Sequence, residues 1–183
     1  GNTACVELLH DDTHIILDAG TGLRVLGKSR ECPDKYHFVF SHFHWDHING
    51  FPFFDHAFNP NVTFEMYSHY DNAEEVFRNQ MIEPYSPPSV GKTIAKNMTF
   101  HKVEDDKEFF IDDVKVNSHM MRHPGESHSF SFEVDGKKLV YATDVELKTT
   151  DFSGTAEGEA VFRNADVIII DSQYTVEEVY RKE

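Results

Sequence analysis

Cysteine is scarce in this sequence, and its scarcity argues against two classes of small protein. Only two cysteines occur, Cys5 and Cys32, and they form no Cys-x-x-Cys pair. A disulfide-stabilised scaffold needs several cysteines, and a thiolate zinc finger needs closely spaced pairs. Neither kind of protein is indicated. We therefore expect a cytoplasmic protein, because a reducing compartment suits a chain that does not rely on disulfides.

Long apolar runs and an excess of positive charge are also missing. No run approaches the roughly 20 apolar residues that span a bilayer, and residues 1–4 resemble no part of a signal peptide. We expect a soluble protein with no membrane partner. Lys and Arg number 17 against 32 Asp and Glu, for a formal net charge of −15. This charge would repel a polyanion, so a small-molecule substrate is expected and a long nucleic acid is not.

Repeats, low-complexity tracts and linkers are absent as well, so we expect one α/β domain over residues 1–183. Short apolar runs bounded by turn residues predict strands. They cover residues 6–9, 14–17, 37–40, 62–68, 109–111, 114–120, 130–134, 139–142 and 167–170. Helices are expected over residues 50–58, 72–81 and 157–164 and from residue 175. The run 167–170 is continuously apolar, as in strands that are buried on both faces of a sheet.

Histidine is abundant, with 12 residues, and its spacing at one place indicates chemistry. His42 and His44 stand two residues apart at the end of the expected strand 37–40, so in an extended chain their side chains point to the same side. Asp46 and His47 follow directly and would diverge toward a second position. One short loop could therefore supply two metal ions about 3.5–4 Å apart. The alternative is a surface loop that happens to be rich in histidine.

Residues much later in the chain complete the pattern. His123 precedes a proline and a glycine, which could present an imidazole at a sheet edge, although alone it would be an ordinary loop histidine. Asp144 follows the strand 139–142 and could be a turn cap. Together with the histidines, it is better interpreted as a carboxylate that bridges two ions. Asp18 and Asp171 also stand at strand ends, and they either orient ligands and fix loops or are purely structural.

These residues carry a resemblance to a known family. His-Phe-His-Trp-Asp-His at residues 42–47 resembles the HxHxDH signature of the metallo-β-lactamase superfamily. Other segments resemble successive motifs of its phosphodiesterase-like branch, which includes ribonuclease Z and the cyclic-phosphate phosphodiesterases. These segments are residues 17–22, 41–50, 123–125, 141–144 and 171–175. The resemblance covers nearly the whole chain and implies an αββα sandwich with metals at the common edge of its two sheets.

The resemblance also implies a set of metal ligands. It assigns one ion to His42, His44 and His123, and a second ion to Asp46 and His47, with Asp144 bridging the two. Imidazole and carboxylate ligands without thiolate suit zinc, and manganese or iron are alternatives. A hydroxide held between the ions would be the nucleophile, and Asp46 would orient or deprotonate it as the catalytic residue. The iron-dependent redox branch usually has an acidic residue where His44 stands, so hydrolysis is favoured over oxygen reduction.

The sequence departs from the family pattern at both ends. The family usually supplies a last histidine to the second ion after the position of Asp171, and no histidine follows His128 here. It also tends to have a strand before residue 1. We therefore expect a fragment of a longer domain, with one ligand of the second ion beyond the C-terminus. The leaving-group acid stays open, because His128 and His69 are available but each fits a surface position better.

The favoured function is hydrolysis of a small phosphodiester, such as a cyclic nucleotide or a cyclic sugar phosphate. Hydrolysis of a lactone or thioester on the same metals is the main alternative, and tRNA 3′ processing is less favoured because no basic arm is visible. From another class, the chain could be a metal-binding regulatory domain without turnover. A homodimer is compatible with the sequence, which does not fix the oligomeric state.

Overall fold

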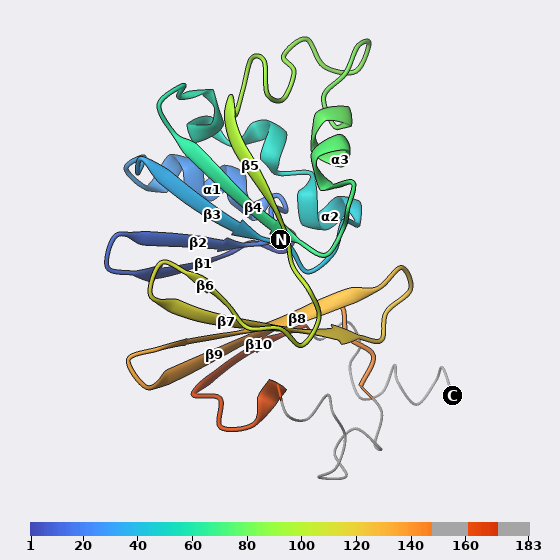
Figure 1. The fold of residues 1–183 in the computed structure, drawn as a ribbon. Coiled ribbons are helices and arrows are strands. Elements are labelled where there is room, and N and C mark those ends of the chain that lie inside the picture. The colour runs from blue at the N-terminus through green and yellow to red at the C-terminus, as the bar shows by residue number, and fades with distance from the viewer. Residues whose placement is uncertain (148–160, 172–183) are drawn as a thin grey trace.

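Two five-stranded sheets form the centre of the molecule (Figure 1). The structure is a computed structural model that describes residues 1–147 and 161–171. The first sheet contains, in spatial order, β1 (Val6–His10), β2 (Thr13–Leu17), β3 (Lys35–Val39), β4 (Thr63–Ser68) and β5 (Asn97–Lys102). The second sheet contains β6 (Phe109–Ile111), β7 (Val114–Met121), β8 (Ser127–Val134), β9 (Lys137–Ala142) and β10 (Val167–Ile170), in the order β10-β9-β8-β7-β6. The expected strands are therefore present, and β5 is an additional one.

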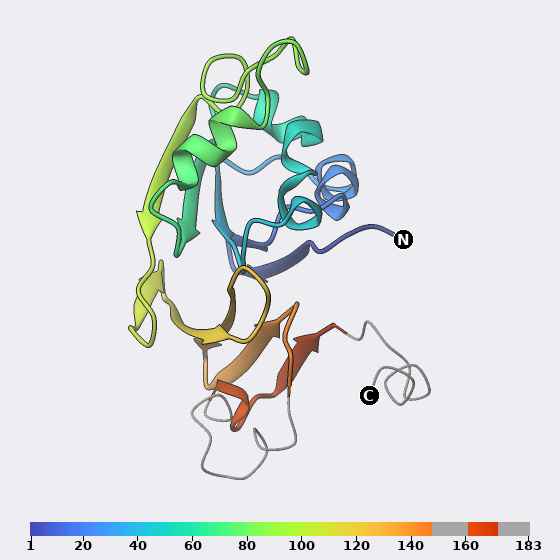
Figure 2. The same ribbon diagram turned by 90° about the vertical axis from the view of Figure 1, so that its right-hand side faces the viewer.

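Strand direction brings several chain segments to one edge of both sheets. β1 and β2 form an antiparallel hairpin, whereas β2, β3, β4 and β5 run parallel. In the second sheet β7 and β9 are both antiparallel to β8, and β10 is parallel to β9. The carboxyl ends of parallel strands meet at the same edge of a sheet. This edge lies on the right in Figure 1 and faces the viewer in Figure 2.

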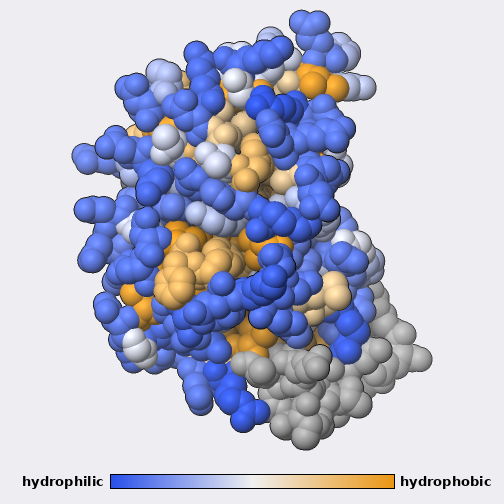
Figure 3. All heavy atoms as spheres, viewed as in Figure 1, coloured by the Kyte–Doolittle hydropathy of each residue, from blue (hydrophilic) through white to orange (hydrophobic). Residues whose placement is uncertain are grey.

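The alternation of side chains along the first sheet divides the core into two layers. Ile16 and Phe38 face the helices, whereas Ile15, Leu17 and Val39 face the second sheet, as expected when successive side chains point to opposite faces. The second sheet adds Val114, Val116, Phe130 and Phe132 to the layer between the sheets. On the face shown in Figure 3, an apolar patch lies at the level where the two sheets meet. Burial between the sheets therefore fixes their relative position.

Short helices cover the outer face of the first sheet (Figure 1). They are α1 (Gly22–Ser29), α2 (Trp45–Ile48), the 3-10 helices η1 (Phe51–Phe53) and η2 (Asp55–Phe58), and α3 (Ala73–Asn79). Helix α1 was not expected, because it begins at a glycine and contains Gly27. A Cβ at Gly27 would lie 2.8 Å from the Phe54 ring. Tertiary packing, more than helix propensity, therefore stabilises α1. No helix in the described ranges is long and apolar enough to cross a membrane.

The structure corrects several local predictions. The single helix expected over residues 50–58 is replaced by η1 and η2, and the one over residues 72–81 is shorter. The prediction that residues 167–170 are buried on both faces is wrong, since Val167 is 50% exposed. Among the described strands, β10 pairs only with β9, and Ile169 alone packs toward the inter-sheet core. The helix expected from residue 175 and most of that over 157–164 lie outside the described residues.

Candidate metal centre

The predicted ligands converge at the shared edge of the two sheets, from loops that are distant in the sequence. The loop after β3 and helix α2 supply His42, His44, Asp46 and His47. The second sheet supplies His123 after β7 and Asp144 after β9. Ligand atoms of His42, His44, His123 and Asp144 all lie within 4.8 Å of one another. A second group with the same spacing consists of Asp46, His47 and Asp144, so the two groups share only Asp144.

One carboxylate oxygen occupies the middle of the cluster. Oδ2 of Asp144 lies 3.5 Å from an imidazole nitrogen, Nε2, of each of three residues: His42, His47 and His123. Asp144 has a left-handed backbone with φ of 54°, which is unusual for a residue other than glycine. Its amide donates a hydrogen bond to Oδ1 of Asp171 at 3.0 Å. Asp171 therefore fixes the backbone that carries Asp144, which is one of the two roles expected for it.

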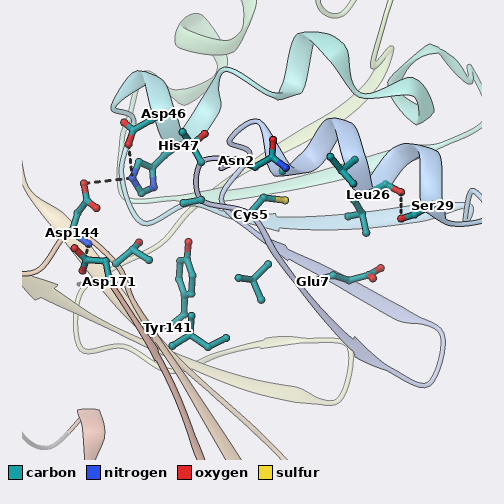
Figure 4. A pocket seen from close by; sticks show the side chains of 17 residues that line it. Asn2, Cys5, Glu7, Leu26, Ser29, Asp46, His47, Tyr141, Asp144 and Asp171 are labelled. Atoms are coloured by element: carbon teal, nitrogen blue, oxygen red, sulfur yellow. Dashed lines mark hydrogen bonds and ion pairs between the residues drawn. The ribbon is translucent and has the colours of Figure 1, made fainter. Parts of the chain in front are cut away.

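The remaining candidate ligands complete the two groups. Nδ1 of His44 lies 3.2 Å from Nε2 of His123, and the His42 and His44 rings meet edge-on with centroids 4.4 Å apart. His44 and His123 therefore direct nitrogens to one region. On the other side, Oδ2 of Asp46 lies 3.6 Å from Nε2 of His47, and Figure 4 shows both side chains facing Asp144. Asp46 is half-exposed, whereas His47 is buried.

Burial and hydrogen bonding show that His42 suits a metal ion. Its side chain is fully buried, and its Nε2 has no hydrogen-bond partner among the described residues. Burial, together with the smaller effect of neighbouring His47, lowers the pKa of His42 to about 3, so the ring is neutral at neutral pH. Buried polar atoms are normally paired, and a neutral imidazole nitrogen is a good ligand for a first-row divalent metal. The residues present therefore fit the metal ions that the chemistry of this donor set implies.

Asp18 organises the layer beneath the ligands. It is fully buried, and its carboxylate accepts hydrogen bonds from five groups. These are the amide and hydroxyl of Ser41 at 2.8 and 2.7 Å, Nδ1 of His47 at 2.7 Å, the Tyr141 hydroxyl at 2.8 Å and the Thr143 hydroxyl at 3.5 Å. Burial lowers the pKa of His47, but its hydrogen bond to Asp18 and the nearby negative charges raise it above the usual value. An Nδ1–H donated to Asp18 leaves Nε2 of His47 facing Asp144, as a metal ligand requires.

Sequence reasoning did not find the roles of Tyr141 and Tyr70. Burial and the charge of Asp18 raise the pKa of Tyr141 far above its usual range, so its hydroxyl stays protonated and donates. Tyr70 follows β4, and its hydroxyl donates to the carbonyl oxygens of Gly125 and Glu126 at 3.2 and 3.4 Å. It thereby holds the loop that carries His123. Tyr141 lies in residues 141–144, one of the segments that resemble the family motifs, whereas no feature of the sequence indicated a role for Tyr70.

The two histidines considered as leaving-group acids lie elsewhere. His69 and His128 stack on one another with ring centroids 3.5 Å apart, and their side chains are 9% and 3% exposed. The expectation that they are surface residues is wrong, because both side chains are buried. Burial lowers the pKa of both histidines, so at neutral pH neither holds the proton that a general acid must donate.

A cleft of about 720 Å³ opens beside His47. Residues of β1, α1, β9 and β10 line it, and Figure 4 shows Asp46, His47 and Asp144 at one end and Glu7 at the other. Cys5, Leu26 and Ile169 contribute apolar surface to the lining of the cleft. The cleft is therefore an elongated, partly apolar space that lies next to Asp46, His47 and Asp144.

Comparison with known proteins agrees with this fold. The model of the β-lactamase superfamily domain matches residues 13–181. The chain therefore belongs to the β-lactamase superfamily, and the resemblance seen in its histidine motif is confirmed. Proteins of this superfamily are mostly metal-dependent hydrolases. No curated protein matches the sequence.

Several solved structures share the metallo-β-lactamase fold. Human tRNase Z, short form, has a TM-score of 0.67 at 17% identity over 98% of this chain and 74% of its own. A diphosphatase of the PhnP family has a TM-score of 0.62 at 16% identity over 91% of this chain, and YhfI from Bacillus subtilis has 0.57 at 17% identity over 76%. The present chain spans only 58% and 53% of the latter two proteins.

Proposed function

We propose that this protein is a two-metal hydrolase that cleaves a small phosphodiester. The observation that carries the proposal is the position of Asp144, whose carboxylate belongs to both groups of ligand atoms. A carboxylate that belongs to both groups can bridge two neighbouring metal ions. We assign His42, His44 and His123 to one ion and Asp46 and His47 to the other, with Asp144 between them and zinc as the favoured metal.

The residues of the chain have separate tasks in this proposal. The ions, when bound, supply Lewis acidity and a nucleophile at neutral pH. Asp46 is half-exposed beside His47, so its second carboxylate oxygen can accept a proton from an attacking water. Asp18 keeps His47 in the tautomer that presents Nε2 to the centre. The cleft beside His47 would hold the part of the substrate that does not react.

Two of the similar structures support a phosphate ester as substrate, because their names describe a diphosphatase and a tRNase. A small substrate is favoured over a polynucleotide, since the net charge of −15 opposes a polyanion. We further propose a cytoplasmic location from the two free cysteines. Lactone or thioester hydrolysis is the second candidate, because the apolar lining of the cleft suits an acyl chain.

The test compares substrate classes on the natural full-length protein after zinc loading. Bis(p-nitrophenyl) phosphate should be hydrolysed faster than a panel of lactones and thioesters, and chelation should abolish the reaction. Asp46→Asn should lower kcat far more than it changes KM, because the group acts on the nucleophile. His42→Ala should lose metal at the centre around Asp144 and lose activity with it, whereas Asp12→Asn, an exposed control, should change neither. Faster lactone or thioester turnover would replace the substrate class, and full activity in His42→Ala would refute the centre.

A further inference from the structure

A second cluster of metal-ligating side chains lies outside the centre described above. It consists of His69, Asp105 and His128, whose ligand atoms all lie within 4.8 Å of one another. His69 follows β4 of the first sheet, His128 is in β8 of the second, and Asp105 is in the connection between β5 and β6. The cluster shares no residue with the two groups around Asp144. It therefore joins the two sheets at a separate point.

Both imidazoles of this cluster approach the same carboxylate oxygen. Oδ1 of Asp105 lies 3.2 Å from Nε2 of His128 and 3.6 Å from Nδ1 of His69. The two rings are nearly parallel, with an interplanar angle of 7°. Other histidines outside the main centre also meet carboxylates, including His119 with Asp106 at 2.8 Å. In the described part of the chain, only the pair at Asp105 combines two imidazoles with one carboxylate outside that centre.

The two rings are buried without their full set of hydrogen bonds. Nε2 of His69 and Nδ1 of His128 are buried and have no partner among the described residues. Burial lowers the pKa of His69 to about 3 and also lowers that of His128. Both rings are therefore neutral at neutral pH and can donate a lone pair to a metal. Lys102, the cation nearest His69, already contacts Asp71 at 2.7 Å.

We propose that His69, Asp105 and His128 bind a further divalent transition-metal ion, of the zinc class, which links the two sheets. The donor set is two imidazoles and one carboxylate, which suits zinc and its neighbours. Because the two rings are nearly parallel, the lone pairs of their nitrogens do not converge on one point. Binding of a single ion therefore requires one ring to turn. We place this turn at His69, whose Nε2 has no hydrogen-bond partner among the described residues. Asp105 is 40% exposed, so solvent can reach the remaining coordination position and the ion can enter there.

The test counts zinc on the natural full-length protein and locates it. After zinc loading and removal of loose metal, Asp105→Asn and His128→Gln should each lose about one zinc per chain relative to wild type. Asp106→Asn and His119→Gln are matched controls, because they alter a neighbouring histidine–carboxylate pair that lacks a second imidazole. These controls should keep the wild-type stoichiometry. Anomalous diffraction at the zinc edge should show a peak between His69 and His128.

The outcomes separate this site from the main centre. His42→Ala should lose zinc at the main centre and retain the peak between His69 and His128. If His128→Gln does not fold, Asp105→Asn decides the stoichiometry, because its carboxylate is partly exposed and the substitution keeps its shape. An unchanged zinc count in Asp105→Asn, or no anomalous peak between the rings while the main centre is filled, would overturn the proposal.

Discussion

Asp18 is the residue on which the orientation of the candidate ligands depends most. Its backbone φ of 57° lies in the left-handed region, and its buried carboxylate meets Ser41, His47 and Tyr141. A strained, buried and multiply hydrogen-bonded carboxylate at a loop end is typical of a functional site. The candidate metal ligands are therefore held by a group that is itself out of reach of solvent.

Replacing Asp18 with asparagine should weaken zinc binding by about 10–100-fold. The neutral amide keeps the size of the carboxylate but removes the charge that favours the correct His47 tautomer. Competition with a chromophoric zinc chelator measures this change. Asp12→Asn removes the same charge from an exposed turn and should leave zinc affinity unaltered. Equal affinities for both variants would show that Asp18 has only a structural role.

At the scale of one element, the loop between β7 and β8 positions His123 through its glycine. Gly125 has a φ of +88°, and a Cβ there would lie 3.2 Å from Nε2 of His44. Gly136, in the turn between β8 and β9, has a φ of +70° and nothing within 4 Å of a Cβ. The two glycines therefore share a backbone conformation that disfavours a side chain, but only Gly125 also contacts the centre.

This difference defines a matched pair of substitutions. Gly125→Ala and Gly136→Ala should each destabilise the fold by roughly 1 kcal/mol or more, because alanine is strained at positive φ. Only Gly125→Ala should also weaken zinc binding, since its methyl group crowds the nitrogen of His44. Urea unfolding of the metal-free proteins gives the stability change, and zinc titration gives the affinity. Equal zinc affinity in both variants would mean that the loop adapts without moving His44.

At the scale of the whole molecule, the centre connects the two sheets. His42, His44 and His47 belong to the first sheet's loop, whereas His123 and Asp144 follow strands of the second. A ligand that binds only the folded state stabilises it, by about 2.7 kcal/mol when its concentration is 100 times its Kd. Zinc should therefore raise the Tm of wild type in calorimetry and raise that of His42→Ala less. An identical zinc-dependent shift in both proteins would contradict a centre that includes His42.

Stability against acid should depend on buried neutral histidines away from the centre. His56 is 8% exposed and accepts a hydrogen bond from the Tyr36 hydroxyl at 2.7 Å. Burial raises the pKa of that hydroxyl, which therefore keeps its proton, and burial lowers the pKa of His56. Protonation of His56 is consequently less favourable in the folded chain than in the unfolded one, where its pKa is near 6.5.

The sign of the pH dependence follows from this difference. As the pH falls below about 6.5, the unfolded chain takes up a proton at His56 before the folded chain does, so stability falls by at most about 1.4 kcal/mol per pH unit for this group. Urea unfolding with chelator between pH 7.5 and 5.5 should show a shallower loss in His56→Gln than in wild type. Above pH 7.5 the two slopes should coincide. Parallel slopes throughout would show that His56 titrates normally in the folded protein.

The sequence by itself determined the parts of this protein that depend on local pattern. Short apolar runs bounded by turn residues predicted the strands, and Asp135-Gly136 predicted the tight turn, where both residues have positive φ. The spacing of His42, His44, Asp46 and His47 predicted a paired cluster, because two-residue spacing in an extended chain is a local geometric fact. The order of motifs along the chain indicated the family that the β-lactamase superfamily model then confirmed.

Only the tertiary structure decided which distant groups meet and which surfaces are covered. The contact of Tyr141 with Asp18 joins residues 123 positions apart, and no local pattern encodes such a pair. The exposure of β10 depends on which strand forms a sheet edge, and the stacking of His69 on His128 joins residues that follow β4 and lie in β8. Burial depends on how the layers of the fold pack together. The local sequence pattern could therefore predict the types of the candidate ligands, but only the fold determined which groups surround them.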